Sequence, residues 1–385
     1  MSVEGDRILG CGVSVNPEES RGAASSIDLG AAIVLPGLVD AHTHLELSYL
    51  RGMAPSGGSF LDWIRALLAE RRRRPDPESP EILGAVDAGI AEALRSGTAI
   101  VGDISNSLAT VGPLLASRLA ALVFLELIGF NPTDGSAFVS DATARVEKLP
   151  SSDRVRVSLA AHAPYSVAPQ VISAVAEEAA RRFSRPASIH VAESVEEGEF
   201  VLTGRGAWRQ LLEDLGVWNR HWTVPGVSPI QYLDDIGFLK ATTLVVHGVQ
   251  ATAADLARLA DRGTTLVACP RSNLRTGAGR PPIERFYASG LAVAVGTDSL
   301  ASTPDLNLFA ELAEMRRLAP SVPARVLIDS ATRCGARALG FDGYGTIEAG
   351  SRARLIAVDA PASLDDVEEY LVSGVQPEQV RWIEA

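Results

Sequence analysis

Two histidines in the stretch GLVDAHTHLELS, His42 and His44, have the spacing of a shared metal site. They stand one residue apart at the end of an apolar run, and alternate side chains of an extended strand point to the same face. Imidazole nitrogens are common ligands of Zn²⁺ and of Fe²⁺. Because the chain has only six histidines, we expect this pair to bind a metal ion.

Further polar residues end other apolar runs. His162, His190 and His247 each follow such a run, and Asp298 follows another in the stretch GTDS, whereas His221 does not. In a barrel of parallel strands, the strand C-termini meet on one rim, where catalytic side chains gather. The pattern predicts that five histidines and one aspartate share this rim, with His190 and Asp298 as additional metal ligands.

Glu193 lies three residues after His190, in the stretch HVAES. From this position a carboxylate can reach a metal-bound water without binding the metal, which suits a proton shuttle. The alternative is that Glu193 caps the start of a helix. For His247 we favour a catalytic role over metal binding.

Eight short runs rich in Val, Ile, Leu and Ala are typical of buried parallel strands, and segments with helical periodicity lie between them. Eight strand–helix repeats favour a closed (β/α)₈ barrel of the TIM type. An open doubly wound sheet is the alternative, but it requires a Gly-rich phosphate turn after the first strand, which HTHLELS does not provide. We expect the strands at residues 34–42, 98–102, 121–127, 155–161, 187–191, 243–247, 265–269 and 291–296.

The clearest helix is predicted in SFLDWIRALLAERRRR, where Ser59 and Asp62 suggest a capping box. We interpret the arginines at 71–74 as cations that stabilise the helix C-terminus. Residues 205–238 are rich in Trp, Gly and Pro and predict an extended loop, lying over the barrel mouth or outside it. Other helices are expected at residues 80–96, 169–182, 253–262 and 306–318.

Both ends of the chain differ from the middle. Residues before 36 and after 341 contain short, Gly-punctuated alternating segments, which predict one small sheet beside the barrel. We therefore expect a small domain made of residues 1–36 and 341–385, and a barrel domain made of residues 37–340.

Composition excludes several kinds of partner. The 385 residues carry a net charge of −12, which would repel nucleic acid and anionic lipid. The widely spaced Cys11, Cys269 and Cys334 form no disulfide framework and no paired metal motif. The first residues resemble no signal peptide, and no apolar run approaches the roughly 20 residues of a membrane helix. We expect a cytoplasmic protein with a small-molecule substrate.

With these motifs together, the chain resembles the amidohydrolase superfamily, in the branch of aromatic-ring deaminases and chlorohydrolases. The resemblance extends from LPGLVDAHTHLELS through HAPYS, HVAES, HG, CPRSN and GTDS to GTIEAGSRARLIAVD. It implies a distorted (β/α)₈ barrel with a small β-sandwich built from both termini. It also implies one divalent metal, Zn²⁺ or alternatively Fe²⁺, held by His42, His44, His190 and Asp298. His162 stands where members with two metals carry a carboxylated lysine, which supports one metal.

The resemblance further implies hydrolytic deamination. The metal would lower the pKa of its bound water. Asp298 would accept a proton from that water, His247 would stabilise the hydroxide, and Glu193 would protonate the ring nitrogen beside the attacked carbon. The alternatives are a chlorohydrolase, a hydrolase of cyclic amides and a catalytically inactive scaffold.

Two stretches, HTHLELSYLRG and WTVPGVSPIQYLDDIGFL, are most similar to aminodeoxyfutalosine deaminases of menaquinone synthesis. The other substrates to consider are adenosine, methylthioadenosine, adenosylhomocysteine and guanine-type rings, and a homodimer is common in such folds. On this resemblance Glu46 and His162 contact the substrate, and Ser272 and Asn273 line the mouth of the site. The predicted ligands of a substrate carboxylate are Arg271, Arg51 and Arg205.

Overall fold

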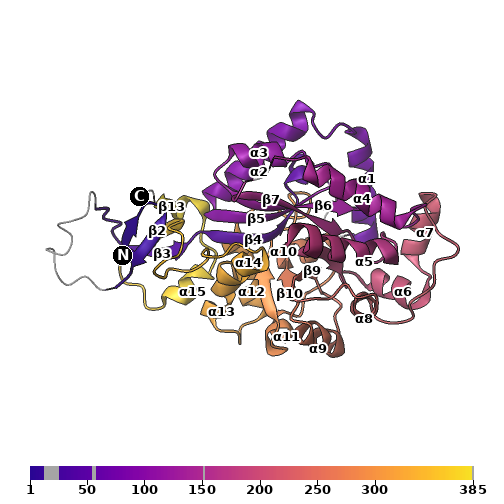
Figure 1. Ribbon diagram of the computed structural model, residues 1–385. Coiled ribbons are helices and arrows are strands. Elements are labelled where there is room, and N and C mark those ends of the chain that lie inside the picture. The colour runs from indigo at the N-terminus through magenta and orange to yellow at the C-terminus, as the bar shows by residue number, and fades with distance from the viewer. Residues whose placement is uncertain (13–25, 54–57, 151, 384–385) are drawn as a thin grey trace.

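The computed structural model describes residues 1–12, 26–53, 58–150 and 152–383. Its centre is an eight-stranded sheet in which every pair of neighbours is parallel and the strands follow their order in the chain (Figure 1). The strands are β4 (Leu38–Thr43), β5 (Thr98–Ser105), β6 (Ala120–Leu127), β7 (Val155–Ala161), β8 (Ala187–Val191), β9 (Thr243–His247), β10 (Thr265–Ala268) and β11 (Ala292–Val295).

The first and last of these strands meet without a continuous ladder. One isolated bridge joins Thr43 to Asp298. Beside it, the buried carboxylate of Asp40 accepts hydrogen bonds from the Thr297 backbone N–H at 3.0 Å and from the Thr297 hydroxyl at 2.6 Å. The predicted (β/α)₈ barrel is therefore confirmed, with its distortion concentrated at this seam.

Helices surround the sheet, and the predicted ones are present. Ser59 accepts a hydrogen bond from the backbone N–H of Asp62 at the start of α1, as the sequence predicted. The helices before β8 are η1 (Leu45–Leu50), α1 (Phe60–Arg73), α2 (Pro80–Arg95), α3 (Val111–Ala116), α4 (Gly135–Glu147), α5 (Pro169–Glu178) and the π-helix η2 (Ala179–Phe183). Those between β8 and the C-terminal strands are α6 (Val195–Thr203), α7 (Ala207–Asp214), α8 (Pro229–Asp235), α9 (Ala253–Asp261), α10 (Pro270–Thr276), α11 (Ile283–Ala288), α12 (Leu308–Leu318), α13 (Ala324–Ser330) and α14 (Arg333–Ala338).

The sequence predicted an extended loop at residues 205–238. This prediction is wrong, because the segment contains the helices α7 and α8. Helix α7 buries Trp208, Leu211 and Leu212 on one face. Helix α8 begins with Pro229 after the capping hydroxyl of Ser228, a combination that favours a helix start. Both helices are short, and the turn-forming residues on either side of them led to the prediction of a loop.

The predicted strand 34–42 is two strands separated by Gly37. Strand β3 (Ala32–Pro36) pairs antiparallel with β12 (Leu355–Asp359), which pairs with β13 (Val380–Ile383), whereas β4 belongs to the barrel. A β-carbon at Gly37 would lie 2.6 Å from Cβ of Ala99, so only glycine fits where the chain passes between the sheets. The apolar run continues across this point and hides the boundary.

The chain termini lie together at one end of the molecule (Figure 1). Besides the three-stranded sheet, β1 (Ser2–Glu4) and β2 (Arg7–Gly10) form an antiparallel hairpin. The remaining helices are α15 (Val367–Leu371) and η3 (Pro377–Gln379). Residues 13–25 and 384–385 of the predicted terminal domain lie outside the described residues, and its boundaries stay a prediction.

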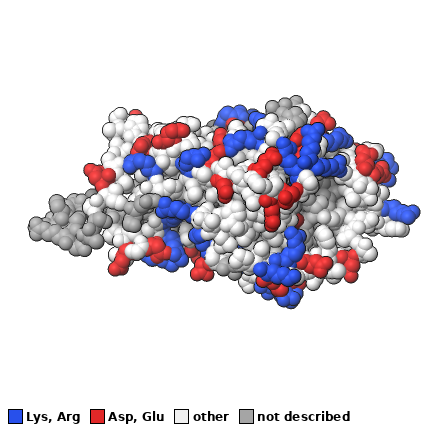
Figure 2. Space-filling view, turned by 90° about the horizontal axis from the view of Figure 1, so that it is seen from above, with Lys and Arg blue, Asp and Glu red and all other residues white. Residues whose placement is uncertain are grey.

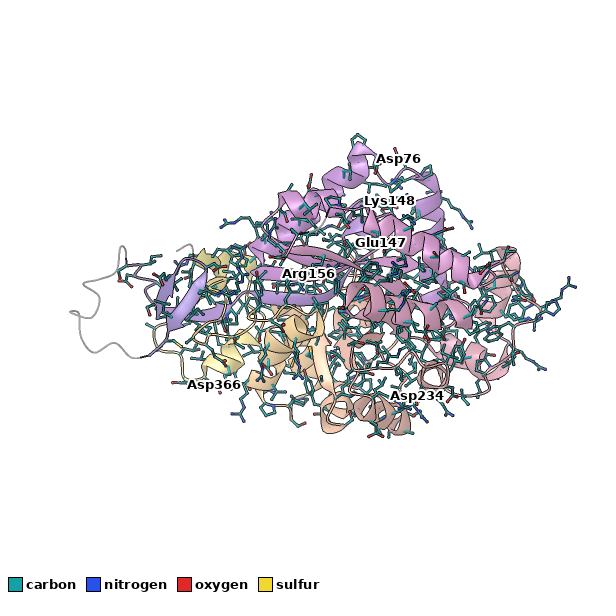
Figure 3. All side chains as sticks on the ribbon, viewed as in Figure 1. Asp76, Glu147, Lys148, Arg156, Asp234 and Asp366 are labelled. Atoms are coloured by element: carbon teal, nitrogen blue, oxygen red, sulfur yellow. The ribbon has the colours of Figure 1, made fainter. Side chains whose placement is uncertain are left out.

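Side chains fill the space between the helices and the sheet (Figure 3). On the face shown in Figure 2, basic and acidic side chains are interspersed. An ion pair at the end of α1 joins Arg74 to Glu70, whose charged atoms are 3.0 Å apart. Cys11, Cys269 and Cys334 are free thiols. Among the described residues, we find no helix with the length and apolar content to span a membrane.

Candidate active site

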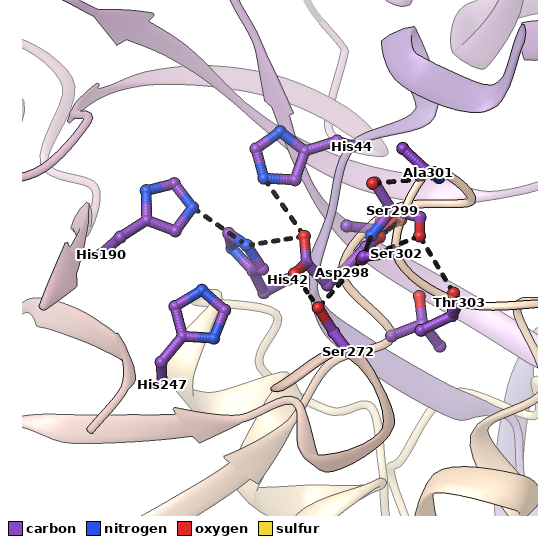
Figure 4. A network of polar contacts seen from close by, with 12 residues as sticks. His42, His44, His190, His247, Ser272, Asp298, Ser299, Ala301, Ser302 and Thr303 are labelled. Atoms are coloured by element: carbon purple, nitrogen blue, oxygen red, sulfur yellow. Dashed lines mark hydrogen bonds and ion pairs between the residues drawn. The ribbon is translucent and has the colours of Figure 1, made fainter. Parts of the chain in front are cut away.

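The predicted metal ligands converge at the C-terminal ends of the barrel strands. His42 lies in β4 and His44 directly follows it, His190 lies in β8, and Asp298 follows β11. The four side chains point toward one another (Figure 4). Nε2 of His42 lies 3.3 Å from Nε2 of His190 and 3.8 Å from Oδ1 of Asp298. Nε2 of His44 lies 3.6 Å from the same carboxylate oxygen. Three imidazoles and one carboxylate thus present ligand atoms to a common centre.

Within the described part of the chain, side chains that could hold a metal form three overlapping groups. In each group the three ligand atoms lie within 4.8 Å of one another: His42, His44 and Asp298; His42, His190 and His247; and Glu126, His162 and His190. Nitrogen and carboxylate oxygen donors in this number fit Zn²⁺ or another divalent transition metal. The residues present therefore fit the implied ion.

The electrostatics of the cluster favour neutral imidazoles. Burial, followed by the charge of neighbouring His190, lowers the pKa of His42, His44 and His247 well below the usual range. A neutral imidazole is the form that binds a metal. These three imidazoles are thus in their ligating state at neutral pH.

Left-handed backbone turns direct two of these side chains. His247 has φ of 79° and Asp298 has φ of 63°. Residues other than glycine seldom adopt this conformation, and such residues gather at functional sites. Both positions are the turns that carry the chain out of a barrel strand, which places each side chain over the barrel axis.

Asn273 joins His247 to Glu193. The Asn273 side-chain nitrogen Nδ2 lies 3.3 Å from the Glu193 carboxyl group and 3.0 Å from Nδ1 of His247. The other ring nitrogen of His247, Nε2, lies 3.5 Å from Oε1 of Glu193. The three side chains therefore form one connected polar group beside the metal cluster.

Glu193 is buried beside these groups, and its loop is held by Glu197. The carboxylate of Glu197, which has no exposed surface, accepts the backbone N–H groups of Ala192 and Glu193 at 2.9 Å each. Burial, followed by the nearby Asp298 and Glu197, raises the pKa of Glu193 well above its usual range. A carboxyl group that holds its proton near neutral pH can both donate and accept one, which suits a shuttle.

Ser272 and Asn273 lie behind the reacting groups and not at the mouth of the site. The hydroxyl of Ser272 donates to Oδ2 of Asp298 at 2.5 Å, and it contacts the hydroxyl of Ser302 at 2.9 Å. Asn273 joins Glu193 to His247, as described above. Both are fully buried. Neither residue lines the cavity described below, and both contact other predicted site residues; their predicted contact with the substrate stays a prediction.

A cavity of about 300 Å³ opens over the cluster. It is bounded mainly by aromatic and aliphatic side chains, among which Trp208 is stacked on Tyr165 at a centroid distance of 3.6 Å. Of the predicted site residues, those that line it are His44, His162, His190, Glu193, His247 and Asp298. Segment 205–238 contributes Trp208, Leu211, Leu212, Leu215 and Val217, so part of it covers the mouth.

The predicted carboxylate ligands lie away from this cavity. Arg271 is paired with Asp305 and with the fully buried Glu311, at 2.9 Å each. Arg51 is paired with Glu92, and Arg205 is exposed and does not line the cavity. The guanidinium of Arg271 is therefore engaged by neighbouring carboxylates, whereas Arg51 is an exposed side chain in an ion pair.

Glu46 is also not a cavity residue. Its carboxylate accepts hydrogen bonds from the hydroxyls of Ser105 and Ser107, both at 2.5 Å, and from the Ser107 backbone N–H at 3.0 Å. Its other oxygen, Oε1, accepts a hydrogen bond from the Asn106 backbone N–H at 3.3 Å. Glu46 therefore fastens the loop after β5, and its predicted contact with the substrate stays a prediction. Two other charged residues, Arg71 and Glu126, do line the cavity. Sequence reasoning missed both, because Arg71 matched a helix C-terminus and Glu126 lies inside an apolar strand.

The whole-chain comparisons agree with this geometry. The model of the amidohydrolase family matches residues 33–378. The chain belongs to the amidohydrolase family. The expectation of a hydrolase that acts on carbon–nitrogen bonds is confirmed by this membership.

Individual members of the amidohydrolase family resemble the chain over most of its length. It is 31% identical over 350 residues to a 5-methylthioadenosine/S-adenosylhomocysteine deaminase of Nitratidesulfovibrio vulgaris, covering 88% of this chain and 74% of that one. It is 31% identical over 318 residues to the aminodeoxyfutalosine deaminase of Deinococcus radiodurans, covering 80% and 74%. The structure of Helicobacter pylori aminofutalosine deaminase with methylthio-coformycin has a TM-score of 0.85 and 28% identity, covering 99% and 92%.

Proposed function

We propose that this protein is a metal-dependent deaminase of a 6-aminopurine nucleoside. The observation that carries the proposal is the placement of Glu193 and His247 side by side in a buried cavity, next to three imidazoles and the Asp298 carboxylate. The cavity is large enough for a small ligand and is bounded by rings that can stack on a base.

Among such nucleosides we propose 6-amino-6-deoxyfutalosine, converted to futalosine and ammonia in menaquinone synthesis. The similarity to enzymes named for this substrate in D. radiodurans and H. pylori supports this choice. The similarity to methylthioadenosine/adenosylhomocysteine deaminases supports the second candidate, a nucleoside of that kind.

The reaction replaces the exocyclic amino group by oxygen, with water as the other substrate and ammonia as the second product. A divalent ion, Zn²⁺ by its ligand preference, would be held by His42, His44, His190 and Asp298, and it would make a water molecule more acidic. The carboxylate of Asp298 takes one proton from the attacking water. A neutral His247 with its proton on Nε2 donates a hydrogen bond to the attacking oxygen.

Glu193 moves the protons on the purine. It first protonates the ring nitrogen next to the carbon under attack, so that this carbon becomes a better electrophile. The tetrahedral carbon then holds both oxygen and the amino group. Protons passed through Asp298 and Glu193 convert that amino group to ammonia, which leaves with the electron pair of the C–N bond. General acid–base steps of this kind contribute about 10²–10⁴-fold.

The test is ammonia release by zinc-loaded protein from aminodeoxyfutalosine, adenosine, methylthioadenosine, adenosylhomocysteine and guanine. We expect the highest kcat/KM with aminodeoxyfutalosine and release slowed about 10²–10⁴-fold in the Glu193→Gln variant. A preference for methylthioadenosine would assign the second candidate. No ammonia from any of them would refute purine deamination and favour chlorinated triazines or cyclic amides, which the panel would then include.

A further inference from the structure

The cavity has one polar wall that the proposed chemistry does not use. Apart from the metal cluster and Glu193, the charged residues lining the cavity are Arg71, from the last turn of α1, and Glu126, from β6. Asn106 joins them: its oxygen accepts a hydrogen bond from Nη2 of Arg71 at 2.9 Å, and its NH₂ donates to Oε2 of Glu126 at 2.8 Å. The wall is therefore a connected unit.

Arg71 is held from behind and has donors left for a ligand. Its Nη2 lies 3.6 Å from Oε1 of Glu46, a buried carboxylate already fastened to the loop after β5. Within the described part of the chain, Nε and Nη1 of Arg71 have no hydrogen-bond partner, and the side chain is 30% exposed. A guanidinium fixed on one edge and open on the other is preorganised to donate hydrogen bonds into the cavity.

Glu126 contributes an unused acceptor. The residue is 5% exposed, and its buried Oε1 has no hydrogen-bond partner in the described structure. Nδ1 of His190 lies 3.5 Å away but donates to the carbonyl of His162 at 2.8 Å. A buried carboxylate oxygen without a donor is costly, and its place on the cavity wall indicates that a ligand supplies the donor.

The chemistry of this wall selects hydroxyl groups over an anion. The positive charge of Arg71 is already balanced by Glu46, and Glu126 adds a second carboxylate, so a negatively charged ligand group would not be favoured here. A hydroxyl both donates and accepts, and it matches one donor on Arg71 and one acceptor on Glu126.

We propose that Arg71 and Glu126, linked by Asn106, bind sugar hydroxyls of the substrate and make the enzyme select ribosides over deoxyribosides and free bases. This inference rests on the proposed deaminase function, since it assumes a purine placed over the metal cluster. A site built to hydrogen-bond a hydroxyl discriminates strongly against an analogue that lacks it, because the buried partners are then left unpaired.

Two variants test the proposal, Arg71→Met and Glu126→Gln. The matched controls are Arg72→Met, which alters an exposed arginine on the same helix, and Glu147→Gln, which alters an exposed glutamate on α4. The assay is kcat/KM for adenosine, 2′-deoxyadenosine, 3′-deoxyadenosine and adenine. We expect the ratio of riboside to deoxyriboside to fall at least tenfold in both test variants. The control variants should keep the wild-type ratio. In all variants kcat/KM for adenine should stay within about twofold of the wild-type value.

Calorimetric binding of inosine and 2′-deoxyinosine measures the same selectivity without turnover. If wild-type protein binds inosine more tightly than its deoxy analogue but deaminates no purine, the proposed function fails while the hydroxyl site stands. Metal analysis accompanies each variant. If Glu126→Gln loses the metal, the riboside ratio of Arg71→Met alone tests the proposal.

Unchanged riboside ratios in Arg71→Met would overturn the proposal. A fall in kcat/KM confined to carboxylate-bearing nucleosides would also overturn it, since Arg71 would then bind an anionic group.

Discussion

Replacing Arg271 by alanine should destabilise the protein and leave its choice of substrate unchanged. The guanidinium Nε lies 2.9 Å from Oε1 of Glu311, and the Arg271 backbone N–H donates to Oε2 of Glu311 at 3.2 Å. Two further N–H groups reach Oδ1 of Asp305 at 2.9 Å. The Nε–Oε1 contact is close enough for an ion pair but is not aligned as a hydrogen bond.

The size of the effect follows from burial. Glu311 has no exposed surface, and the Arg271 side chain is 13% exposed. Removing one partner of a buried ion pair costs about 3–5 kcal/mol, because the other charge is left without compensation. This is a large part of the 5–15 kcal/mol that typically separates folded from unfolded protein.

Urea unfolding of wild type and Arg271→Ala measures this cost at pH 9, where Glu311 in the wild-type protein is ionised because its pKa is about 8. The double variant Arg271→Met, Glu311→Leu should recover most of the lost stability, since it removes both charges. Arg333→Ala is the control, because that arginine forms an exposed pair with Asp329 and should cost no more than about 1 kcal/mol. A variant Arg271→Ala as stable as the control, or one with a raised KM only for a carboxylate-bearing nucleoside, would refute the reasoning.

The same pair predicts a pH dependence. Burial raises the pKa of Glu311 to about 8, against 4.5 for an exposed glutamate, although the Arg271 charge opposes the shift. Between these values the folded state binds more protons than the unfolded state. The contribution of Glu311 to stability therefore decreases as pH rises from about 4.5 to 8. Glu311→Gln removes this slope, so its stability relative to wild type should improve over that range.

Three further changes have defined outcomes. Glu193→Gln should keep its metal but lose about 10²–10⁴-fold in kcat, measured by ammonia release; a wild-type rate would remove Glu193 from proton transfer. His42→Ala should retain no metal after dialysis, by elemental analysis, and full occupancy would contradict its role as ligand. Asp40→Ala should lower unfolding stability by about 2–4 kcal/mol, because both Thr297 donors lose their acceptor. Loss of less than about 0.5 kcal/mol, the level of the exposed control Asp87→Ala, would contradict this last estimate.

The order of the barrel strands could be predicted from the sequence because each buried parallel strand is a continuous apolar run. The residues on the rim could be predicted because a polar residue ends each run. Seven of the eight barrel strands lie where the sequence predicts them. The remaining one was merged with β3 because Val34–Pro36 and the start of β4 are equally apolar. Only the close approach of Gly37 to Ala99 separates the two strands, and that approach depends on contacts far along the chain.

The residues around the site were harder to assign because their partners come from distant segments. Arg71 has the same local sequence context as its neighbour Arg72, yet only Arg71 lines the cavity. Arg271 follows a barrel strand, as a binding residue would, but the buried carboxylate of Glu311 on α12 engages it. Position along a strand predicts which rim a residue occupies, and it does not predict which partner the side chain meets there.

The seam between β4 and β11 has a consequence for how this protein matures. Contacts across it join residues that are 255 and 257 positions apart in the chain. A growing polypeptide that has not yet delivered β11 holds His42, His44 and His190 but lacks Asp298, the carboxylate of the proposed ligand set. The proposed ligand set is therefore complete only after the last strand docks beside the first. Metal binding at full affinity would then mark the completion of the barrel.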